Sequence, residues 1–114
     1  MKVLFIVTSY WAIGEMEIAV QFAKGLSSPQ EVLFWVPRKH EAYVQAKGFR
    51  TASLYFNMAK LNQIMLKNIQ DTFQPDFIVL SDYLNYVFCK KHYGLTLEHR
   101  TYLLSWKEEC RWKK

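Results

Sequence analysis

The 114-residue chain has little of several residue types, and each shortage argues against a class of protein. Its two cysteines, Cys89 and Cys110, form no close-spaced ligand pair, so neither a disulfide framework nor a zinc site is indicated. No HExxH motif or Cys/His cluster occurs, and we expect no metal site. The uninterrupted apolar run at the start, Val3–Val7, is too short for an export signal, and nothing approaches a membrane span. We therefore expect a cytoplasmic protein without an integral membrane segment.

The excess of positive over negative charge is also small: the net charge is only +5, and the basic residues are scattered along the chain. This distribution disfavours a nucleic acid as partner. A phosphate-binding loop is disfavoured too, since Gly14 is alone where a dinucleotide loop needs three glycines. Glu15 and Glu17 add negative charge at the start of the following helix, where they would repel an anion. We predict no cofactor.

What the chain does contain is apolar: 51% of its residues are hydrophobic and 17% are aromatic, enough for one domain with a buried core. Apolar runs alternate with helix-like patterns of three- and four-residue spacing. The predicted strands are Val3–Val7, Val32–Val36, Phe49–Leu54 and Phe77–Leu80. The predicted helices are Met16–Leu26, Arg38–Lys47, Met58–Phe73 and Tyr83–Tyr93, with Gly48 ending the second and Asn57 capping the third. The order β-α-β-α-β-α-β-α predicts an α/β fold, an open parallel Rossmann-like sheet with helices on both faces.

Residues 95–114 differ from the rest, so we divide the chain into a Rossmann-like half-domain, 1–94, and a basic, aromatic tail, 95–114. The tail lacks a strand bounded by glycine or proline, and we expect an irregular or helical end. A four-stranded sheet would leave its last edge uncovered, and this tail is a candidate cover for that edge. It is also a place where a longer protein could have been cut.

Ligands of open parallel sheets bind beyond the carboxyl ends of the strands, near the switch in strand order. The first and fourth strands commonly lie side by side at such a switch, so Glu15 and Asp82 could face one crevice. Each carboxylate also has a structural interpretation. Glu15 is a first-turn acid that suits the helix dipole, and Ser81 or Asp82 is a suitable cap for the next helix.

Aromatic residues in the first connection, Tyr10 and Trp11, could stack on a sugar ring or another flat apolar face; the alternative is a hydrophobic plug over the end of the sheet. The histidines His40, His92 and His99 are each expected to face solvent. No Gly-x-Ser-x-Gly elbow is present, which disfavours a hydrolase.

Three consecutive stretches, "MKVLFIVTSYWAIGEMEIAVQFAKGL", "EVLFWVP" and "RKHEAYVQAKGFR", followed later by "QPDFIVLSD", carry a family resemblance. Over residues 1–93 the chain resembles the N-terminal half of a GT-B type glycosyltransferase. The resemblance implies an acceptor-binding domain. In inverting members a histidine in the first turn removes the proton from the acceptor hydroxyl, and an aspartate after the later strand orients it. Gly14 matches the family's glycine, Asp82 matches the aspartate, and Glu15 stands in place of the histidine.

On this resemblance, Glu15 and Asp82 are the predicted catalytic residues. The predicted acceptor-binding residues are Tyr10, Trp11, Gly14 and Tyr83. The family binds its nucleotide-sugar donor in a C-terminal domain with a glycine-rich and acidic motif, which this chain lacks. The resemblance therefore implies a chain that is inactive alone. It would need a donor-binding subunit or a missing C-terminal domain, and its ligand would be a sugar or small-molecule acceptor.

Two alternatives belong to other classes of protein. One is a non-catalytic, flavodoxin-like binding module, which a yellow colour from bound flavin would reveal. The other is a partner-dependent subunit, suggested by the exposed sheet edge and the basic tail.

Overall fold

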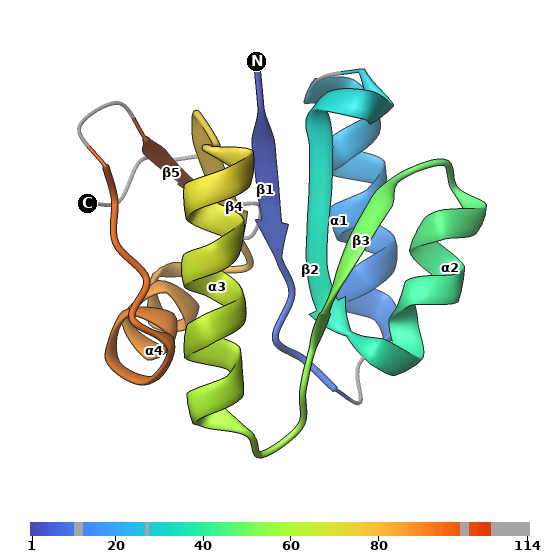
Figure 1. Cartoon of the computed structure of the whole chain (residues 1–114). Coiled ribbons are helices and arrows are strands. Elements are labelled where there is room, and N and C mark those ends of the chain that lie inside the picture. The colour runs from blue at the N-terminus through green and yellow to red at the C-terminus, as the bar shows by residue number, and fades with distance from the viewer. Residues whose placement is uncertain (11–12, 27, 99–100, 106–114) are drawn as a thin grey trace.

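The computed structural model of the chain describes residues 1–10, 13–26, 28–98 and 101–105. These residues form a five-stranded parallel sheet with helices on both faces (Figure 1). The strands are β1 (Val3–Ile6), β2 (Val32–Pro37), β3 (Arg50–Leu54), β4 (Phe77–Leu80) and β5 (Tyr102–Ser105). The helices are α1 (Ile13–Leu26), α2 (Glu41–Ala46), α3 (Ala59–Phe73) and α4 (Tyr83–Tyr93), with 3₁₀ turns at Pro29–Glu31 and Arg38–His40. The predicted α/β class, with an open Rossmann-like sheet, is confirmed.

The strand order is β3-β2-β1-β4-β5, and all neighbouring strands are parallel. In the central strand β1, Phe5 is in register with Phe34 of β2 and with Val79 of β4. The chain winds outward from β1 through β2 and β3, then crosses back to β4. The switch in strand order thus lies between β1 and β4, the neighbours expected from the sequence. Flavodoxin has the order 2-1-3-4-5, so the topology gives no support to the flavodoxin-like alternative.

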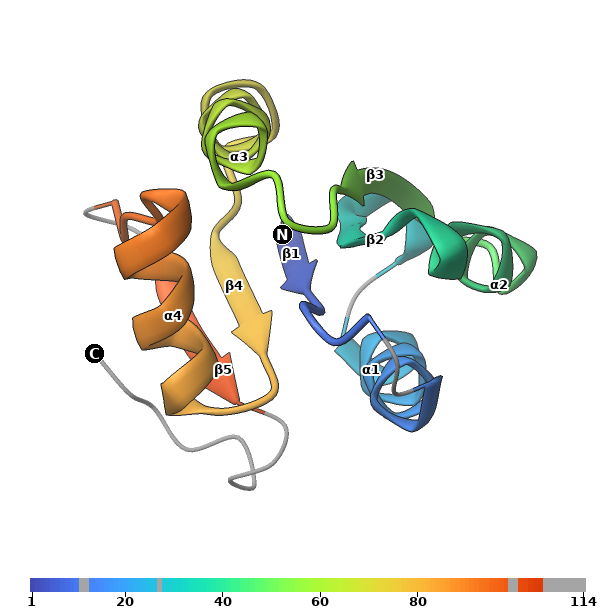
Figure 2. The same cartoon turned by 90° about the horizontal axis from the view of Figure 1, so that it is seen from below.

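Both faces of the sheet are buried, because successive side chains of a strand point to opposite faces. On the face covered by α1 and α2, the Phe5 and Phe34 rings stack with centroids 4.8 Å apart, within a cluster that includes Met16. On the other face, covered by α3 and α4 (Figure 2), Trp35 and Leu66 are fully buried. Burying a large apolar side chain stabilises a fold by about 1.5–3 kcal/mol. The all-apolar sequence of β1 is what a strand covered on both faces requires.

The tail contains strand β5, so the expectation of an irregular or helical end was wrong for this segment. Leu103 is buried in the core below α3 and α4, while the Tyr102 ring lies 5.5 Å from that of Phe77 on the other face. The Thr101 hydroxyl donates to the carbonyl oxygen of Pro75 at 3.0 Å. These are tertiary contacts, which a local pattern does not contain. The prediction that the tail covers the β4 edge is confirmed, since it does so as an added strand.

The connection from β3 to α3 differs from the prediction at one residue. Asn57 does not cap α3: Met58 occupies the N-cap position, without a capping bond from its side chain. Asn57 instead adopts a left-handed backbone conformation with φ of 56°, which asparagine tolerates better than most residues. Gly48 follows α2 with φ of +94° and ends that helix region as predicted.

Candidate ligand-binding site

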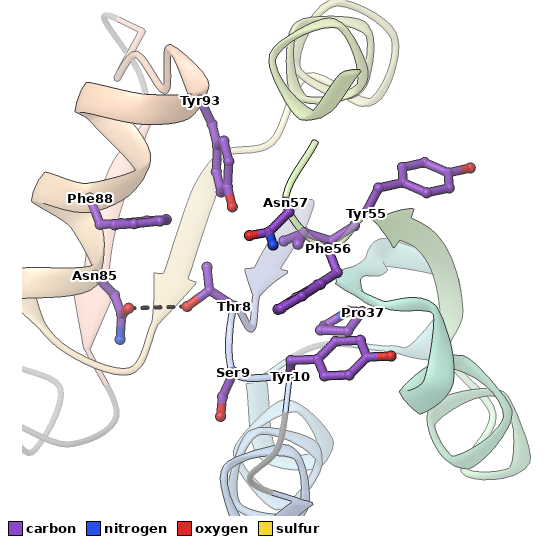
Figure 3. A pocket seen from close by; sticks show the side chains of 11 residues that line it. Thr8, Ser9, Tyr10, Pro37, Tyr55, Phe56, Asn57, Asn85, Phe88 and Tyr93 are labelled. Atoms are coloured by element: carbon purple, nitrogen blue, oxygen red, sulfur yellow. Dashed lines mark hydrogen bonds between the residues drawn. The ribbon is translucent and has the colours of Figure 1, made fainter. Parts of the chain in front are cut away.

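A cavity of about 390 Å³ opens at the carboxyl ends of the strands, at the switch between β1 and β4. Figure 2 views this edge of the sheet, and Figure 3 shows the cavity with its side chains. The volume lies within the range of small-molecule sites. The lining residues come from the ends of β1, β2 and β3, from the β3–α3 connection and from α4. They are Thr8, Ser9, Tyr10, Pro37, Leu54, Tyr55, Phe56, Asn57, Asn85, Phe88 and Tyr93.

The polar side of the cavity is a short hydrogen-bonded chain across the switch. The Thr8 hydroxyl, directly beyond β1, donates to Asn85 Oδ1 of α4 at 3.1 Å (Figure 3). Asn85 Nδ2 in turn donates to the Ser81 hydroxyl at the end of β4. With its hydrogen used in this way, Thr8 Oγ1 still has lone pairs that can accept from a ligand. These two hydrogen bonds link the two halves of the sheet, and the groups that make them present hydroxyls and an amide to the cavity.

The other walls are aromatic. The rings of Tyr10 and Phe56 lie with centroids 4.8 Å apart, and those of Phe88 and Tyr93 lie 5.4 Å apart, nearly perpendicular. In Figure 3, Phe88 and Tyr93 of α4 lie on the opposite side of the cavity from Tyr10 and Phe56. Such walls provide flat apolar faces on two sides of a bound molecule.

Among the described residues that line the cavity, none carries a fixed charge. Burial raises the pKa of the Tyr93 phenol, helped by its neighbour Cys89 and opposed by a hydrogen bond with Asn62, so the phenol stays protonated at neutral pH. The Lys39 ammonium lies 4.7 Å from the centre of the Tyr10 ring, which engages this charge in a cation–π contact. The cavity therefore suits a neutral ligand.

Asn62, fully buried in the first turns of α3, holds the β3–α3 connection in place. Its Oδ1 accepts the backbone N–H of Tyr55 and its Nδ2 donates to the Tyr55 carbonyl oxygen, each at 2.8 Å. One buried amide thus satisfies both backbone groups of a residue that has left the sheet. By fixing Tyr55, it also fixes the adjoining Phe56 in the cavity wall.

His40 plays a comparable part for the β1–α1 connection, and the expectation that it faces solvent was wrong. Only 3% of its surface is exposed, and its Nε2 lies 3.1 Å from the carbonyl oxygen of Tyr10, to which it donates. Because Pro37 ends β2, the 3₁₀ turn that follows directs the ring inward. His92 is exposed as expected, and His99 lies outside the described residues.

The predicted residues of the first connection occupy different places. Tyr10 lines the cavity, and its role in acceptor binding stays a prediction. Gly14 is exposed and Glu15 half-buried in the first turn of α1, and neither is among the lining residues. The position of Glu15 agrees with its interpretation as a first-turn acid. Trp11 lies outside the described residues.

The predicted residues after β4 are at the start of α4. Asp82 is its N-cap, with Oδ1 accepting the backbone N–H of Asn85 at 3.0 Å, so the capping interpretation is confirmed. Tyr83 is 39% exposed, with its ring 5.7 Å from that of Tyr86. Neither Asp82 nor Tyr83 is among the lining residues, and their roles in chemistry or acceptor binding stay predictions.

Several lining residues were missed by sequence reasoning, above all Thr8, Asn85, Phe56 and Phe88. A signal existed for Thr8, which is the first polar residue after an apolar strand in the connection that the switch rule selects. Asn85 lies within a helix, and Phe56 and Phe88 resemble ordinary apolar residues, so the sequence gives no local reason to place them there.

Two classes of site find no support in the described part of the chain. No group of three or more His, Cys, Asp or Glu residues among the described residues is placed to hold a metal ion. No helix there combines the length and the apolar character that crossing a membrane requires.

The fold and the cavity define an α/β protein with a doubly wound parallel sheet and a cavity at its topological switch. The chain belongs to the family of unknown function DUF6365, whose sequence profile matches residues 22–99. No curated protein and no solved structure matches the chain. The matched segment contains the β3–α3 connection and α4, which supply most of the aromatic walls.

Proposed function

We propose that the protein binds a sugar, or another neutral hydroxyl-bearing ring, in the switch cavity, as the acceptor-side domain of a glycosyltransferase-like enzyme. The observation that carries the proposal is the lining, which has aromatic rings on two sides and hydroxyl and amide groups at the strand ends, with no fixed charge on any lining residue that the structure describes. A sugar ring has an apolar face for the rings and hydroxyls for Thr8 and Asn85. The sequence resemblance to GT-B glycosyltransferases adds the role of acceptor.

A phosphate-bearing ligand fits this edge less well. Helix α1 begins with Glu15 in its first turn, so its positive dipole end is already matched by a carboxylate. The donor nucleotide is therefore assigned to a second domain or subunit, and the described chain is proposed not to transfer sugar alone.

The proposal is tested by titrating the protein with methyl glycosides of glucose, galactose, mannose and N-acetylglucosamine, followed by NMR or calorimetry. At least one should bind in the millimolar range or tighter, about 4 kcal/mol of binding free energy. Thr8→Val should weaken that binding about tenfold, because it removes a hydroxyl that can both donate and accept a hydrogen bond. The control Thr72→Val removes an exposed hydroxyl of α3, which donates to the Asn68 carbonyl oxygen, and should change nothing. Absence of binding by all four glycosides would contradict the proposal.

The acceptor-side part of the proposal has its own test, an assay of nucleotide-sugar hydrolysis by the isolated chain. No turnover is expected, and robust turnover would refute the assignment of the donor site to another domain. In an enzyme reconstituted with the donor-binding part, Glu15→Gln should abolish transfer if Glu15 is the base. Unchanged transfer would remove Glu15 from the mechanism.

A further inference from the structure

Helix α4 carries apolar residues on its outer face as well as on its inner face. The inner face packs into the core through Tyr86 and Cys89, both buried. Ten large apolar side chains are exposed in the described part of the chain, and four of them belong to this 11-residue helix: Tyr83, Leu84, Val87 and Phe88. A helix that is apolar on both faces is typical of a helix covered on both sides. The outer face of α4 is therefore a candidate interface.

The exposed apolar residues of α4 form a stripe along the helix. Leu84, Val87, Phe88 and Lys91 follow one another at spacings of three or four residues, which places them on the same side of the helix. Leu84 is 76% exposed, and Val87 and Phe88 are each 42% exposed. Among the described elements, α4 lies at the outer end of the layer that it forms with α3 (Figure 2). Contiguous exposed apolar surface of this kind marks an interaction site.

The two ends of the stripe carry opposite charge, and this points to a partner. The carboxylate of Asp82 caps the N-terminal end of α4, whereas Lys90 and Lys91 lie in its last turn. Such a surface is complementary to a second copy of itself in the antiparallel direction, because each basic end then meets an acidic end. A parallel pair would bring the lysines together. An anionic membrane or an acidic peptide would place negative charge beside Asp82, so a second copy of the chain fits both ends best.

We infer that two copies of the chain dimerise through α4, with the two helices antiparallel about a two-fold axis near Val87 and Phe88. This inference goes beyond the proposed function and does not depend on it. From the rise of about 1.5 Å per residue, Leu84 and Lys91 lie about 5 Å from the axis, on opposite sides of it. Lys91 of each copy therefore lies over Leu84 of the other. Its methylene stem covers apolar surface, and its ammonium reaches toward Asp82.

Sedimentation equilibrium of the full chain, over about 1–500 μM protein, tests the inference. We expect a monomer–dimer equilibrium with a Kd of about 1–100 μM, because one short helix from each copy makes a small interface. Val87→Ser removes apolar surface at the axis from both copies and should raise the Kd at least about tenfold. The matched control is Ile18→Ser, at a 52% exposed position of α1, which should leave the Kd unchanged. A thermal melt of each variant verifies that the fold is kept.

A double-mutant cycle tests the antiparallel pairing. Lys91→Glu replaces an attraction by a repulsion and should raise the Kd at least about tenfold. Asp82→Asn keeps the capping acceptor and removes the charge, so in that background Lys91→Glu should raise the Kd by only about threefold or less. Lys24→Glu makes the same charge change at an exposed position of α1 and should leave the Kd unchanged.

The outcomes are distinct from those of the sugar titration. A chain that stays monomeric up to about 500 μM overturns the inference, and sugar binding by that monomer leaves the proposed function standing. A dimer that Val87→Ser does not weaken, or that Ile18→Ser weakens equally, also overturns it. If Lys91→Glu has the same effect with and without Asp82→Asn, the antiparallel pairing is wrong and the inference falls.

Discussion

Asn62 shows how a single buried polar residue can shape a site that it does not line. Its amide holds both backbone groups of Tyr55, and these would be left without partners if the amide were removed. Asn62→Ala should therefore lower the free energy of unfolding by about 2–3 kcal/mol, the cost of buried unsatisfied groups. Urea denaturation measures this loss.

The control for this variant is Asn68→Ala, an exposed position of the same helix, which should change stability by less than about 0.5 kcal/mol. Equal effects at both positions would show that Asn62 does not hold the connection.

Cys89 gives a prediction about pH. Burial raises the pKa of its thiol to about 12, from an ordinary value of 9.0. The unfolded chain releases this proton above about pH 9, whereas the folded chain holds it until about pH 12. The stabilisation from this group is therefore complete below pH 9 and is lost progressively as the pH rises toward 12. A Cys89→Val variant should lack this part of the decline in unfolding free energy.

The same burial predicts poor reactivity of the folded thiol. In a Cys110→Ser background, which leaves one thiol, modification by a disulfide reagent at pH 8 should be at least about a hundredfold slower in the folded protein than in urea. Rapid modification of the folded protein would contradict the buried position.

Sequence reasoning reached only part of the site at this scale. Tyr10 was found because it stands in a connection selected by the switch rule. Asn62 and His40 escaped it, since their hydrogen bonds go to backbone groups of Tyr55 and Tyr10, 7 and 30 residues away in the sequence, and only the folded chain sets these contacts. A polar residue in a periodic pattern gives no sign of whether it faces solvent or a buried carbonyl.

Among the elements, helix α4 connects the fold to the site, because it carries Asn85, Phe88 and Tyr93. Asp82 caps this helix. Asp82→Ala should lower stability by about 1 kcal/mol, whereas Asp82→Asn keeps an acceptor for the Asn85 N–H and should cost only a few tenths. Thermal or urea unfolding of the two variants tells them apart.

The Asp82→Asn variant also separates capping from chemistry, since it keeps the acceptor and removes the charge. If Asp82→Asn lowers the free energy of unfolding as much as Asp82→Ala does, the contribution of Asp82 to stability does not come from the capping hydrogen bond.

Strand β5 is the element that the sequence did not reveal, and its contribution is measurable. Leu103→Ala should cost about 2–5 kcal/mol, because it leaves a cavity in the core below α3 and α4. The same substitution at Leu84, which is 76% exposed on α4, should be nearly neutral. Similar stabilities of these two variants would contradict the pairing of β5 with β4.

The other strands were predictable for a physical reason. A strand covered on both faces must be apolar throughout, so β1, β2 and β4 stand out as continuous runs. Within the described part of the chain, β5 pairs with β4 alone and exposes Tyr102, and its sequence is correspondingly less distinctive.

At the scale of the whole molecule, the two ends of the sheet differ in charge. The carboxyl end holds the neutral aromatic cavity. Near the amino ends of β4 and β5, another hollow of about 420 Å³ has the carboxylates of Asp71, Asp76 and Glu98 among its lining residues. A neutral sugar should therefore bind at the carboxyl end, where aromatic rings offer apolar faces, in preference to the amino end, where the carboxylates remain hydrated.

The most direct measurement is a map of amide chemical shifts in ¹⁵N-labelled protein during titration with the methyl glycoside that binds best. The account predicts that the largest changes cluster at the backbone amides of Ser9, Tyr10, Asn57 and Asn85, which meet at the switch of the sheet. Changes clustered instead at Gln74 and Thr101, at the acidic end, would contradict the account, and so would the absence of any change with all four sugars.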